Sequence, residues 1–263
     1  MSNILAEIIA ERKQTVARLK QHIPVQAWEM MPGFLKKTKS LRKILEAGNS
    51  TGIIAEFKRA SPSKGIINDH ADVLNVTAAY EFHGAAALSV LTEPLFFNGN
   101  NDDLLNAAIT ATIPVLRKDF IFDKYQVTES KALGADVILL IAACLKPDDV
   151  KDLAIFAKQL NLEVILEIHS EAELGHICSE VDMVGVNNRD LKTFSLDINR
   201  SVELGKKIPA GKIKIAESGI EDTETIRVFK EAGFSGFLMG GKFMSSANPG
   251  AAFEQFVQKL KQG

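Results

Sequence analysis

Short apolar segments recur along this chain, and amphipathic segments separate them. Eight of these segments are nearly continuous in hydrophobicity and rich in β-branched residues, which is typical of parallel strands buried on both faces. They cover residues 51–58, 87–93, 114–120, 135–141, 163–169, 183–189, 212–219 and 236–240. Helices are predicted between them, for example over 71–83, 123–133, 147–160, 171–179 and 223–232.

The ends of these helices carry recognisable signals. Asp123, Ser170 and Asp222 stand at helix starts, where a side-chain oxygen can cap free backbone N–H groups. A glycine follows several helices and precedes the next strand, as at Gly84 and Gly134. Eight strands that alternate with helices predict an α/β fold, the (β/α)8 TIM barrel. A doubly wound open sheet is the alternative, but no GxGxxG follows the first strand.

The first 50 residues do not follow this repeat. Apolar residues at helical spacing predict an amphipathic helix over 4–19, and a second helix is predicted over 41–47. We therefore expect 1–263 to form a single barrel domain in which 1–50 is a helical extension covering the barrel. No Gly/Ser/Pro-rich linker divides the chain.

Composition excludes several classes of partner. The hydrophobic fraction is 46% and the net charge is −2, which is typical of a globular protein that binds neither nucleic acid nor anionic membrane surfaces. Cys144 and Cys178 lie far apart without a CxxC, which indicates reduced thiols. Glu7 and Glu11 interrupt the apolar core that a signal peptide needs. We expect a cytoplasmic protein that acts as a monomer, without a membrane partner.

The first predicted strand ends with charged residues. Glu56 and Lys58 lie two residues apart, so both side chains share a face with Ile54. This arrangement indicates the floor of a site, and a structural ion pair is the alternative. Other predicted strands end in the same way, at Glu93, Lys118-Asp119, Glu167 with His169, Asn187 with Arg189, Glu217-Ser218 and Gly240-Gly241. Because a barrel collects the carboxyl ends of its strands at one mouth, the ring of polar residues predicts a catalytic site.

Individual roles follow from residue type. Lys118 shares a face with Leu116, and a lysine at a barrel mouth can have a lowered pKa and donate a proton near neutral pH. The alternative for Lys118 is an ion pair with Glu56 or Glu167, and both interpretations can hold together. Glu167 follows two apolar residues and is a candidate acid, with a pairing role for Lys118 as the alternative. Arg189 suits a carboxylate or phosphate. His169 is expected to be structural, and no spacing indicates a metal site.

The last two predicted strands end in small residues. Ser218-Gly219 and Gly240-Gly241 would let backbone N–H groups approach an anion closely. TIM barrels often bind phosphate after their seventh and eighth strands. The pair of segments therefore predicts a phosphate site, with ordinary turn glycines as the alternative.

Several ordered motifs resemble those of the indole-3-glycerol-phosphate synthase family. The first-strand signature at 53–65 is the most specific of them. The others occur in the family's order at 92–93, 97–99, 116–120, 166–169, 185–191 and 216–220. The N-terminal helix resembles the family's extra helix. One departure is Gly241, followed by Lys242, where relatives often carry Ser or Glu after the glycine of the last strand.

The resemblance implies a substrate and a reaction. The substrate is 1-(2-carboxyphenylamino)-1-deoxyribulose 5-phosphate, a phosphorylated small molecule. Its ring closes onto the sugar carbonyl, CO₂ leaves, and dehydration gives indole-3-glycerol phosphate without a cofactor. Lys118 would be the general acid at the carbonyl, Glu167 a second acid/base group and Glu56 the base in dehydration. Lys58 would neutralise a substrate anion and hold Glu56.

The resemblance also implies binding residues. Asn187 and Arg189 would hold the sugar and the carboxylate. Phosphate would lie on Ser218, Gly219, Gly240 and Gly241, where contact with Gly241 would come from its backbone. The substrate would also meet Ser61, and an apolar slot for the aryl ring would be formed by Pro62, Phe97, Phe120, Leu139 and Phe194.

Two other classes remain as alternatives. One is another phosphosugar barrel such as phosphoribosylanthranilate isomerase, which has a catalytic Cys near the end of its first strand, where this chain has Glu56 and Lys58. The other is a non-catalytic ligand-binding barrel, which would have little use for two carboxylates beside a lysine because unpaired buried charge is costly.

Overall fold

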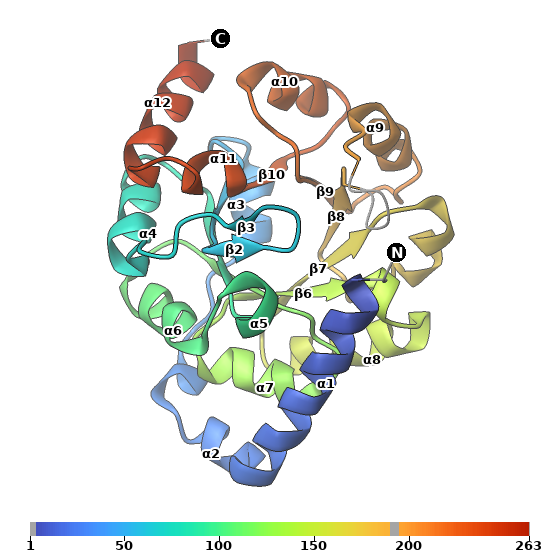
Figure 1. The fold of residues 1–263 in the computed structure, drawn as a ribbon. Helices are drawn as coiled ribbons and strands as arrows, with labels where there is room; N and C mark the ends of the chain where they lie inside the picture. Colours follow the sequence, from blue (N-terminus) through green and yellow to red (C-terminus); the bar gives the residue numbers. More distant parts are fainter. Residues whose placement is uncertain (1–3, 190–194, 263) are drawn as a thin grey trace.

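Eight parallel strands close into a barrel at the centre of the molecule (Figure 1). A computed structural model describes residues 4–189 and 195–262 of the chain. The barrel strands are β1 (Ile53–Phe57), β4 (Ala87–Leu91), β5 (Val115–Lys118), β6 (Val137–Ile141), β7 (Glu163–Ile168), β8 (Met183–Asn187), β9 (Ile213–Glu217) and β10 (Gly236–Met239). Each pairs with the next along the chain, and β1 closes the ring by pairing with both β10 and β4. The predicted TIM barrel is confirmed.

Helices surround the barrel, because the outward faces of the strands are apolar and must be covered. The outer helices are α4 (Val73–Phe82), α6 (Asn101–Thr110), α7 (Lys124–Ala132), α8 (Pro147–Gln159), α9 (Ile198–Lys206), α10 (Thr223–Glu231) and α12 (Pro249–Gln262). Asp123 and Asp222 cap α7 and α10 as predicted, by accepting the backbone N–H of Tyr125 and Thr225.

Side chains alternate between the two faces of each strand. Ile54, Leu116 and Ile165 belong to the apolar cluster inside the barrel, whereas Ile53 and Phe57 pack outward in the larger cluster beneath the helices. Residues two positions after the inward apolar ones point the same way. These are the charged residues at the strand ends, so the alternation itself delivers them to the mouth of the barrel.

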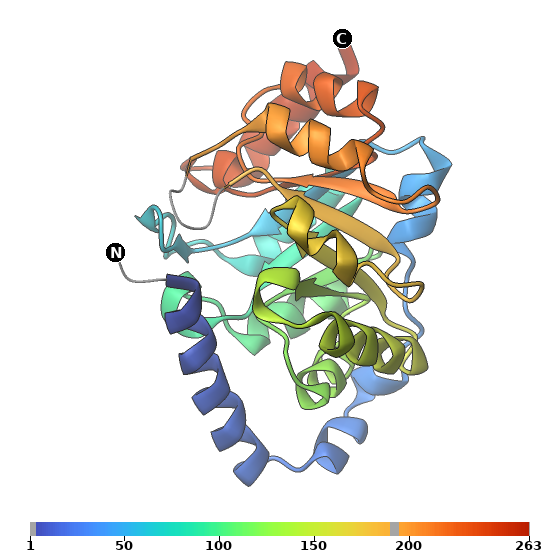
Figure 2. The ribbon, with the colours of Figure 1, turned by 90° about the vertical axis from the view of Figure 1, so that its right-hand side faces the viewer.

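The N-terminal extension reaches both ends of the barrel. It contains α1 (Ile4–His22), α2 (Val25–Glu29), the 3-10 helix η1 (Pro32–Leu35) and α3 (Leu41–Ala47). Leu41 and Leu45 of α3 join the inner apolar cluster and close the amino-terminal end of the barrel. Figure 2 shows α1 on the opposite side from α3, the side on which the carboxyl ends of the strands open.

Two local features differ from the predicted elements. The segment after β1 forms a small hairpin, β2 (Ala60–Ser61) and β3 (Gly65–Ile66), beside the mouth. The helix predicted over 171–179 is wrong: only a 3-10 helix, η3 (Glu171–His176), forms there. The predicted Ser170 cap is also wrong, because its side chain accepts no capping hydrogen bond, and Gly175 further weakens helix propensity.

Three further short helices follow strand ends at the mouth: α5 (Pro94–Phe97), the 3-10 helix η2 (Ala142–Cys144) and α11 (Gly241–Met244). Within the described ranges, no helix combines the length and hydropathy needed to span a bilayer.

Candidate active site

A cavity of about 210 Å³ opens at the carboxyl ends of the barrel strands. Strand ends, the β2–β3 hairpin and the first turns of α1 all contribute to its wall. Phe194 lies outside the described residues. The other residues identified from the sequence as catalytic or binding all line the cavity: Glu56, Lys58, Ser61, Pro62, Phe97, Lys118, Phe120, Leu139, Glu167, Asn187, Arg189, Ser218, Gly219, Gly240 and Gly241.

Lys118 lies between two buried carboxyl groups. Its Nζ is 2.7 Å from Oε2 of Glu167 and 3.0 Å from Oε2 of Glu217. The three side chains come from β5, β7 and β9, and their exposed fractions are 15%, 5% and 1% respectively. One cation is therefore shared by two carboxyl groups in surroundings that water hardly reaches.

This geometry separates the protonation states of the three groups. Burial lowers the pKa of Lys118, but the charges of Glu167 and Glu217 outweigh burial and raise it above the ordinary value. Burial raises the pKa of Glu167, yet Lys118 and His169 hold it well below the usual range. Burial raises the pKa of Glu217 to about 8. The charge of Lys118 lowers this pKa, but the charge of Glu167 raises it further. At neutral pH the cluster contains an ammonium, a carboxylate and a carboxylic acid.

The expectation of a lowered lysine pKa is therefore wrong. Burial alone would lower the pKa, but closure of the barrel brings the ends of β7 and β9 to the same mouth as the end of β5, and Lys118 gains two carboxyl partners there. The ion pair with Glu167, given as the alternative for Lys118, is present. Its presence does not remove the catalytic hypothesis, because an ammonium held at the mouth is a proton donor.

Glu217 is a site residue that stands at a predicted strand end but is not among the candidates identified from the sequence. Its side chain fits against Gly185 of β8, where a Cβ atom would lie only 2.1 Å from Oε1 of Glu217. That oxygen is buried and has no hydrogen-bond partner among the described residues. Its position in the sequence could have identified it: Glu217 stands two residues after inward-facing Ile215 and directly before Ser218-Gly219.

Glu56 and Lys58 form an ion pair at the end of β1. Glu56 is buried and Lys58 is partly exposed to the cavity. A Cβ atom on Gly240 would lie 2.7 Å from Cβ of Glu56, so glycine at this position lets β10 approach the carboxylate. The pair places one further acid and one further cation within the same cavity.

Asn187 connects Glu167 to the next loop. Its Nδ2 donates to Oε1 of Glu167 over 3.1 Å, and its Oδ1 accepts the backbone N–H of Arg189 over 3.0 Å. The amide fixes the second oxygen of the catalytic candidate while Lys118 holds the first. Arg189 itself lines the cavity.

One wall of the cavity is apolar. Phe97 and Phe120 lie with ring centroids 6.0 Å apart and a tilt of 42°. Pro62 and Leu139 line the same cavity, and Ile4, Leu5 and Ile8 of α1 add to its surface. This wall suits a flat aromatic group, which is stabilised by apolar contact and ring stacking.

Another part of the cavity lining is built from small residues. Ser218 and Gly219 both have left-handed backbone angles, with φ of 69° and 70°. Nδ2 of Asn188 donates to the carbonyl of Ser218 over 2.6 Å and fixes this turn. A Cβ atom on Gly241 would lie 3.5 Å from Nζ of Lys64, which reaches over from the hairpin. Lys64 is thus a second cavity residue that is not identifiable from strand-end position, because only the fold of the hairpin brings it there.

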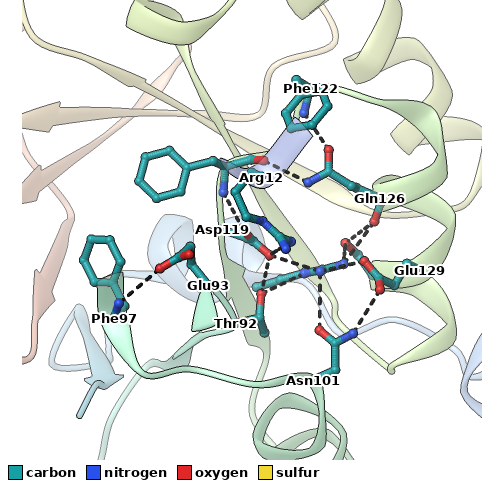
Figure 3. Close-up of polar contacts among 12 residues, drawn as sticks. Arg12, Thr92, Glu93, Phe97, Asn101, Asp119, Phe122, Gln126 and Glu129 are labelled. Atoms are coloured by element: carbon teal, nitrogen blue, oxygen red, sulfur yellow. Dashed lines mark hydrogen bonds and ion pairs between the residues drawn. The ribbon is translucent and has the colours of Figure 1, made fainter. Parts of the chain in front are cut away.

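A buried ionic network connects β5 and the residue that follows it to α1 and α7 (Figure 3). Oδ2 of Asp119 accepts hydrogen bonds from Arg12 of α1 (2.7 Å), from Thr92 (2.6 Å) and from Arg117 (3.0 Å). Arg117 also pairs with Glu129 of α7 over 2.7 Å. Asp119, predicted as part of the polar ring, therefore anchors α1 beside Lys118 instead of serving the cavity chemistry.

Glu93 is likewise structural. It caps α5 by accepting the backbone N–H groups of Leu95, Phe96 and Phe97, at 3.0, 2.7 and 3.1 Å. The contact to Phe97 is visible in Figure 3. This cap places Phe97 against the cavity. The capping role explains why a charged residue stands at this strand end although it takes no part in the chemistry.

Replacing Arg12 by methionine should lower the free energy of unfolding by about 3 kcal/mol, the low end of the cost of breaking a buried ion pair, because Arg117 still faces Asp119. Urea unfolding measures the change. Arg18→Met is the matched control on the same helix: its pair with Glu11 is exposed, so its effect should stay within about 0.5 kcal/mol. Equal effects of the two variants would contradict the anchoring role.

Comparison with known proteins gives a consistent set of relatives. The family model described as "Indole-3-glycerol phosphate synthase" matches residues 5–256. A protein of that name from Bacteroides thetaiotaomicron is 42% identical over 261 residues, covering 99% of this chain and 100% of the relative. Another from Bordetella pertussis is 38% identical over 265 residues, covering 98% of this chain and 100% of the relative.

Solved structures with lower identity share the fold. Tryptophan synthase subunit alpha from Legionella pneumophila superposes with a TM-score of 0.61 at 15% identity, covering 84% of this chain and 97% of that chain. 3-Hexulose-6-phosphate synthase gives a TM-score of 0.63 at 14% identity, covering 80% and 100%. These similarities extend to the barrel architecture alone.

Proposed function

The chain belongs to the indole-3-glycerol phosphate synthase family, and on that premise we propose how the residues of its cavity carry out the family's reaction. The enzyme is a carboxy-lyase of tryptophan biosynthesis. It converts 1-(2-carboxyphenylamino)-1-deoxyribulose 5-phosphate into indole-3-glycerol phosphate, CO₂ and water. Ring closure, decarboxylation and dehydration each require charge or protons to be placed at a defined atom.

Lys118 is the general acid of ring closure. The aromatic carbon that carries the carboxylate attacks the sugar carbonyl, and Lys118 protonates the carbonyl oxygen to a hydroxyl. CO₂ then leaves, its bonding electrons remain in the ring, and the aromatic system is restored. Glu217, protonated and 3.0 Å from Lys118, returns a proton to the lysine. Ionised Glu167 is the second acid/base group and stabilises the ammonium each time it re-forms.

Dehydration uses the same donor and a different base. Lys118 protonates the hydroxyl, which leaves as water, while Glu56 accepts the proton from the carbon next to the nitrogen. Two protons are donated and one is accepted, so each turnover takes up one proton in total, as the conversion of a carboxylate into neutral CO₂ requires. Lys58 holds Glu56 in place through their ion pair. These side chains supply the chemistry, and the proposal includes no cofactor or metal.

Binding follows the charges of the substrate. Its carboxylate is met by Lys58 and Arg189, its sugar by Asn187 and Ser61, and its aryl ring by the apolar wall with Pro62, Phe97, Phe120 and Leu139. Its phosphate is met by backbone N–H groups of Ser218, Gly219, Gly240 and Gly241 and by the ammonium of Lys64. The cations of Lys58, Lys64 and Arg189 in the cavity explain how a chain of net charge −2 binds a ligand with two anionic groups.

One observation carries this proposal: the Nζ of Lys118 lies within 3.0 Å of two carboxyl groups in a cavity with an apolar wall. The pKa of one of them, Glu167, is lowered, and that of the other, Glu217, is raised. Adding the substrate to the purified chain should produce indole fluorescence and one CO₂ for each substrate consumed. A phosphosugar isomerase would release no CO₂, and a ligand-binding barrel would form no product. Neither cysteine lies near the end of β1, since Cys144 follows β6 and Cys178 follows η3.

Substitutions at Gly241 test the placement of the phosphate. Gly241→Val should raise KM about 10- to 100-fold, because a branched side chain blocks the approach of phosphate and loses hydrogen bonds to a charged group. Gly241→Ser is the matched control: a Cβ atom there meets only Nζ of Lys64, at 3.5 Å, so KM should stay within about threefold. Steady-state kinetics give both values, and an unchanged KM in Gly241→Val would place the phosphate elsewhere.

We also propose that the enzyme acts as a monomer in the cytoplasm and binds no nucleic acid. One chain contributes every residue named in the chemistry, and this supports a site that needs no second copy. The thiols of Cys144 and Cys178 are free, which supports a reducing compartment. Light scattering of the purified chain at micromolar concentration would show the oligomeric state.

A further inference from the structure

His169 lies between a catalytic carboxylate and a second, non-catalytic one. Its Nε2 is 3.1 Å from Oε1 of Glu167, and its Nδ1 is 3.7 Å from Oε2 of Glu173. The backbone N–H of His169 donates to the same oxygen of Glu173 over 2.6 Å. The imidazole is thus placed by η3 on one side and touches the reaction machinery on the other.

The two ring nitrogens of His169 are buried beside carboxylates. Its side chain is 10% exposed, and neither nitrogen is aligned for a hydrogen bond with any described residue. A neutral imidazole at this place would gain little from the charges of its two carboxylate neighbours. An imidazolium is attracted by both of them. Geometry therefore favours the charged form, and the direction of the pKa agrees: burial lowers it, but Glu167 and Glu173 outweigh burial and raise it to about 9.

Other groups around the ring do not reverse this result. Lys118 of β5 lies on the far side of Glu167. Cys144 of η2 stays a neutral thiol, because burial and the charges of Glu167 and Glu173 raise its pKa to about 12, against a small opposite effect of Lys13 from α1. Two carboxylates thus remain the dominant charges facing His169.

We propose that His169 is a positioning residue which, as an imidazolium held by Glu173, keeps Glu167 ionised and directed at Lys118 throughout the reaction. The inference rests on the role proposed above for Glu167. Glu167 needs this support, because burial alone would protonate it and Lys118 is neutral for part of each cycle. With two cations on its oxygens and the Asn187 amide, Glu167 remains the charged carboxyl and Glu217 the protonated one.

The proposal has a readout that a merely structural histidine would lack. In His169→Gln the amide nitrogen occupies the place of Nε2 but carries no charge. Removing a cation raises the pKa of the neighbouring carboxyl, so the acidic limb of the kcat–pH profile, set by Glu167, should move upward by about one pH unit. Because the pKa of Glu167 lies well below its usual range, the loss of kcat should be largest on this acidic limb and smaller at pH 7.5, with KM within about twofold, since no substrate contact is lost.

Two further variants separate the effect of charge from that of packing. His176→Gln alters the histidine at the end of η3, whose ring nitrogens contact the backbone carbonyls of Glu173 and Leu145. It should leave the acidic limb in place. Glu173→Gln keeps an oxygen for the backbone of His169 but removes the charge, so the pKa of His169 should fall by about one unit.

The deciding experiment is an NMR titration of the His169 ring in the intact enzyme, assigned by its absence in His169→Gln. An apparent pKa near 9 that falls in both Glu173→Gln and Glu167→Gln supports the proposal. A pKa near 6.5, or an acidic limb unmoved in His169→Gln, overturns it. Nearly full activity of Glu167→Gln would instead refute the role of Glu167, so the two failures are distinguishable.

Discussion

Replacing Lys118 by alanine should abolish most turnover while leaving the barrel folded. Loss of a general acid costs about 10²–10⁴-fold in kcat, and the same change removes the positive charge that stabilises the developing alkoxide. Glu167 and Glu217 lose their shared cation, so each should bind protons more strongly. Indole fluorescence under saturating substrate measures the loss.

The control for Lys118→Ala must separate folding from chemistry. Lys36→Ala removes another partly buried ammonium, one that donates to the carbonyls of Ala108 and Gly134 well outside the cavity. It should lower stability while kcat of the folded enzyme stays near the wild-type value. Turnover of Lys118→Ala within a few-fold of wild type, with a native circular dichroism spectrum, would refute the assignment.

Replacing Glu167 by glutamine should lower kcat about 10²- to 10³-fold and change KM little, because the shape is kept while the charge that holds Lys118 is lost. Glu163→Gln is the matched control on the same strand: its carboxylate lies at the other end of the barrel and accepts from Ser40 and the backbone of Arg42. It should change stability but not kcat. If Glu167→Gln mainly raises KM, the residue only binds substrate.

Much of the architecture was predictable because it depends on local pattern. Continuous apolar runs marked every barrel strand, since both faces of a parallel strand are buried. The two-residue period placed Glu56 and Lys118 on inward faces without knowledge of the neighbouring strands. Even the cavity lining followed, because a closed barrel brings all carboxyl ends to one mouth.

Properties that depend on side chains from several strands were not predictable. The pKa of Lys118 was expected to be lowered, but it is raised by two carboxyl groups that lie 49 and 99 residues away in the sequence. Asp119 and Glu93 looked like site residues because they stand at strand ends, yet one binds Arg12 and the other caps a helix. Sequence spacing gives the face of a strand and not the partner that a side chain meets there.

The N-terminal extension illustrates the same limit. Its helices were predictable from their apolar spacing, but the buried pair between Arg12 and Asp119, 107 residues apart in sequence, was not. This pair connects α1 to the residue next to Lys118, so the extension contributes both to the wall of the cavity and to the placement of the proton donor.

The central claim is that Lys118 donates to the sugar carbonyl of a substrate whose phosphate lies at the glycine-rich end of the cavity. A crystal structure with an analogue whose carbonyl is reduced to a hydroxyl tests it most directly. The account predicts that this hydroxyl lies within hydrogen-bond distance of Nζ of Lys118, with phosphate between Ser218-Gly219 and Gly240-Gly241. A hydroxyl remote from Lys118, or a phosphate at the opposite end of the barrel, would contradict it.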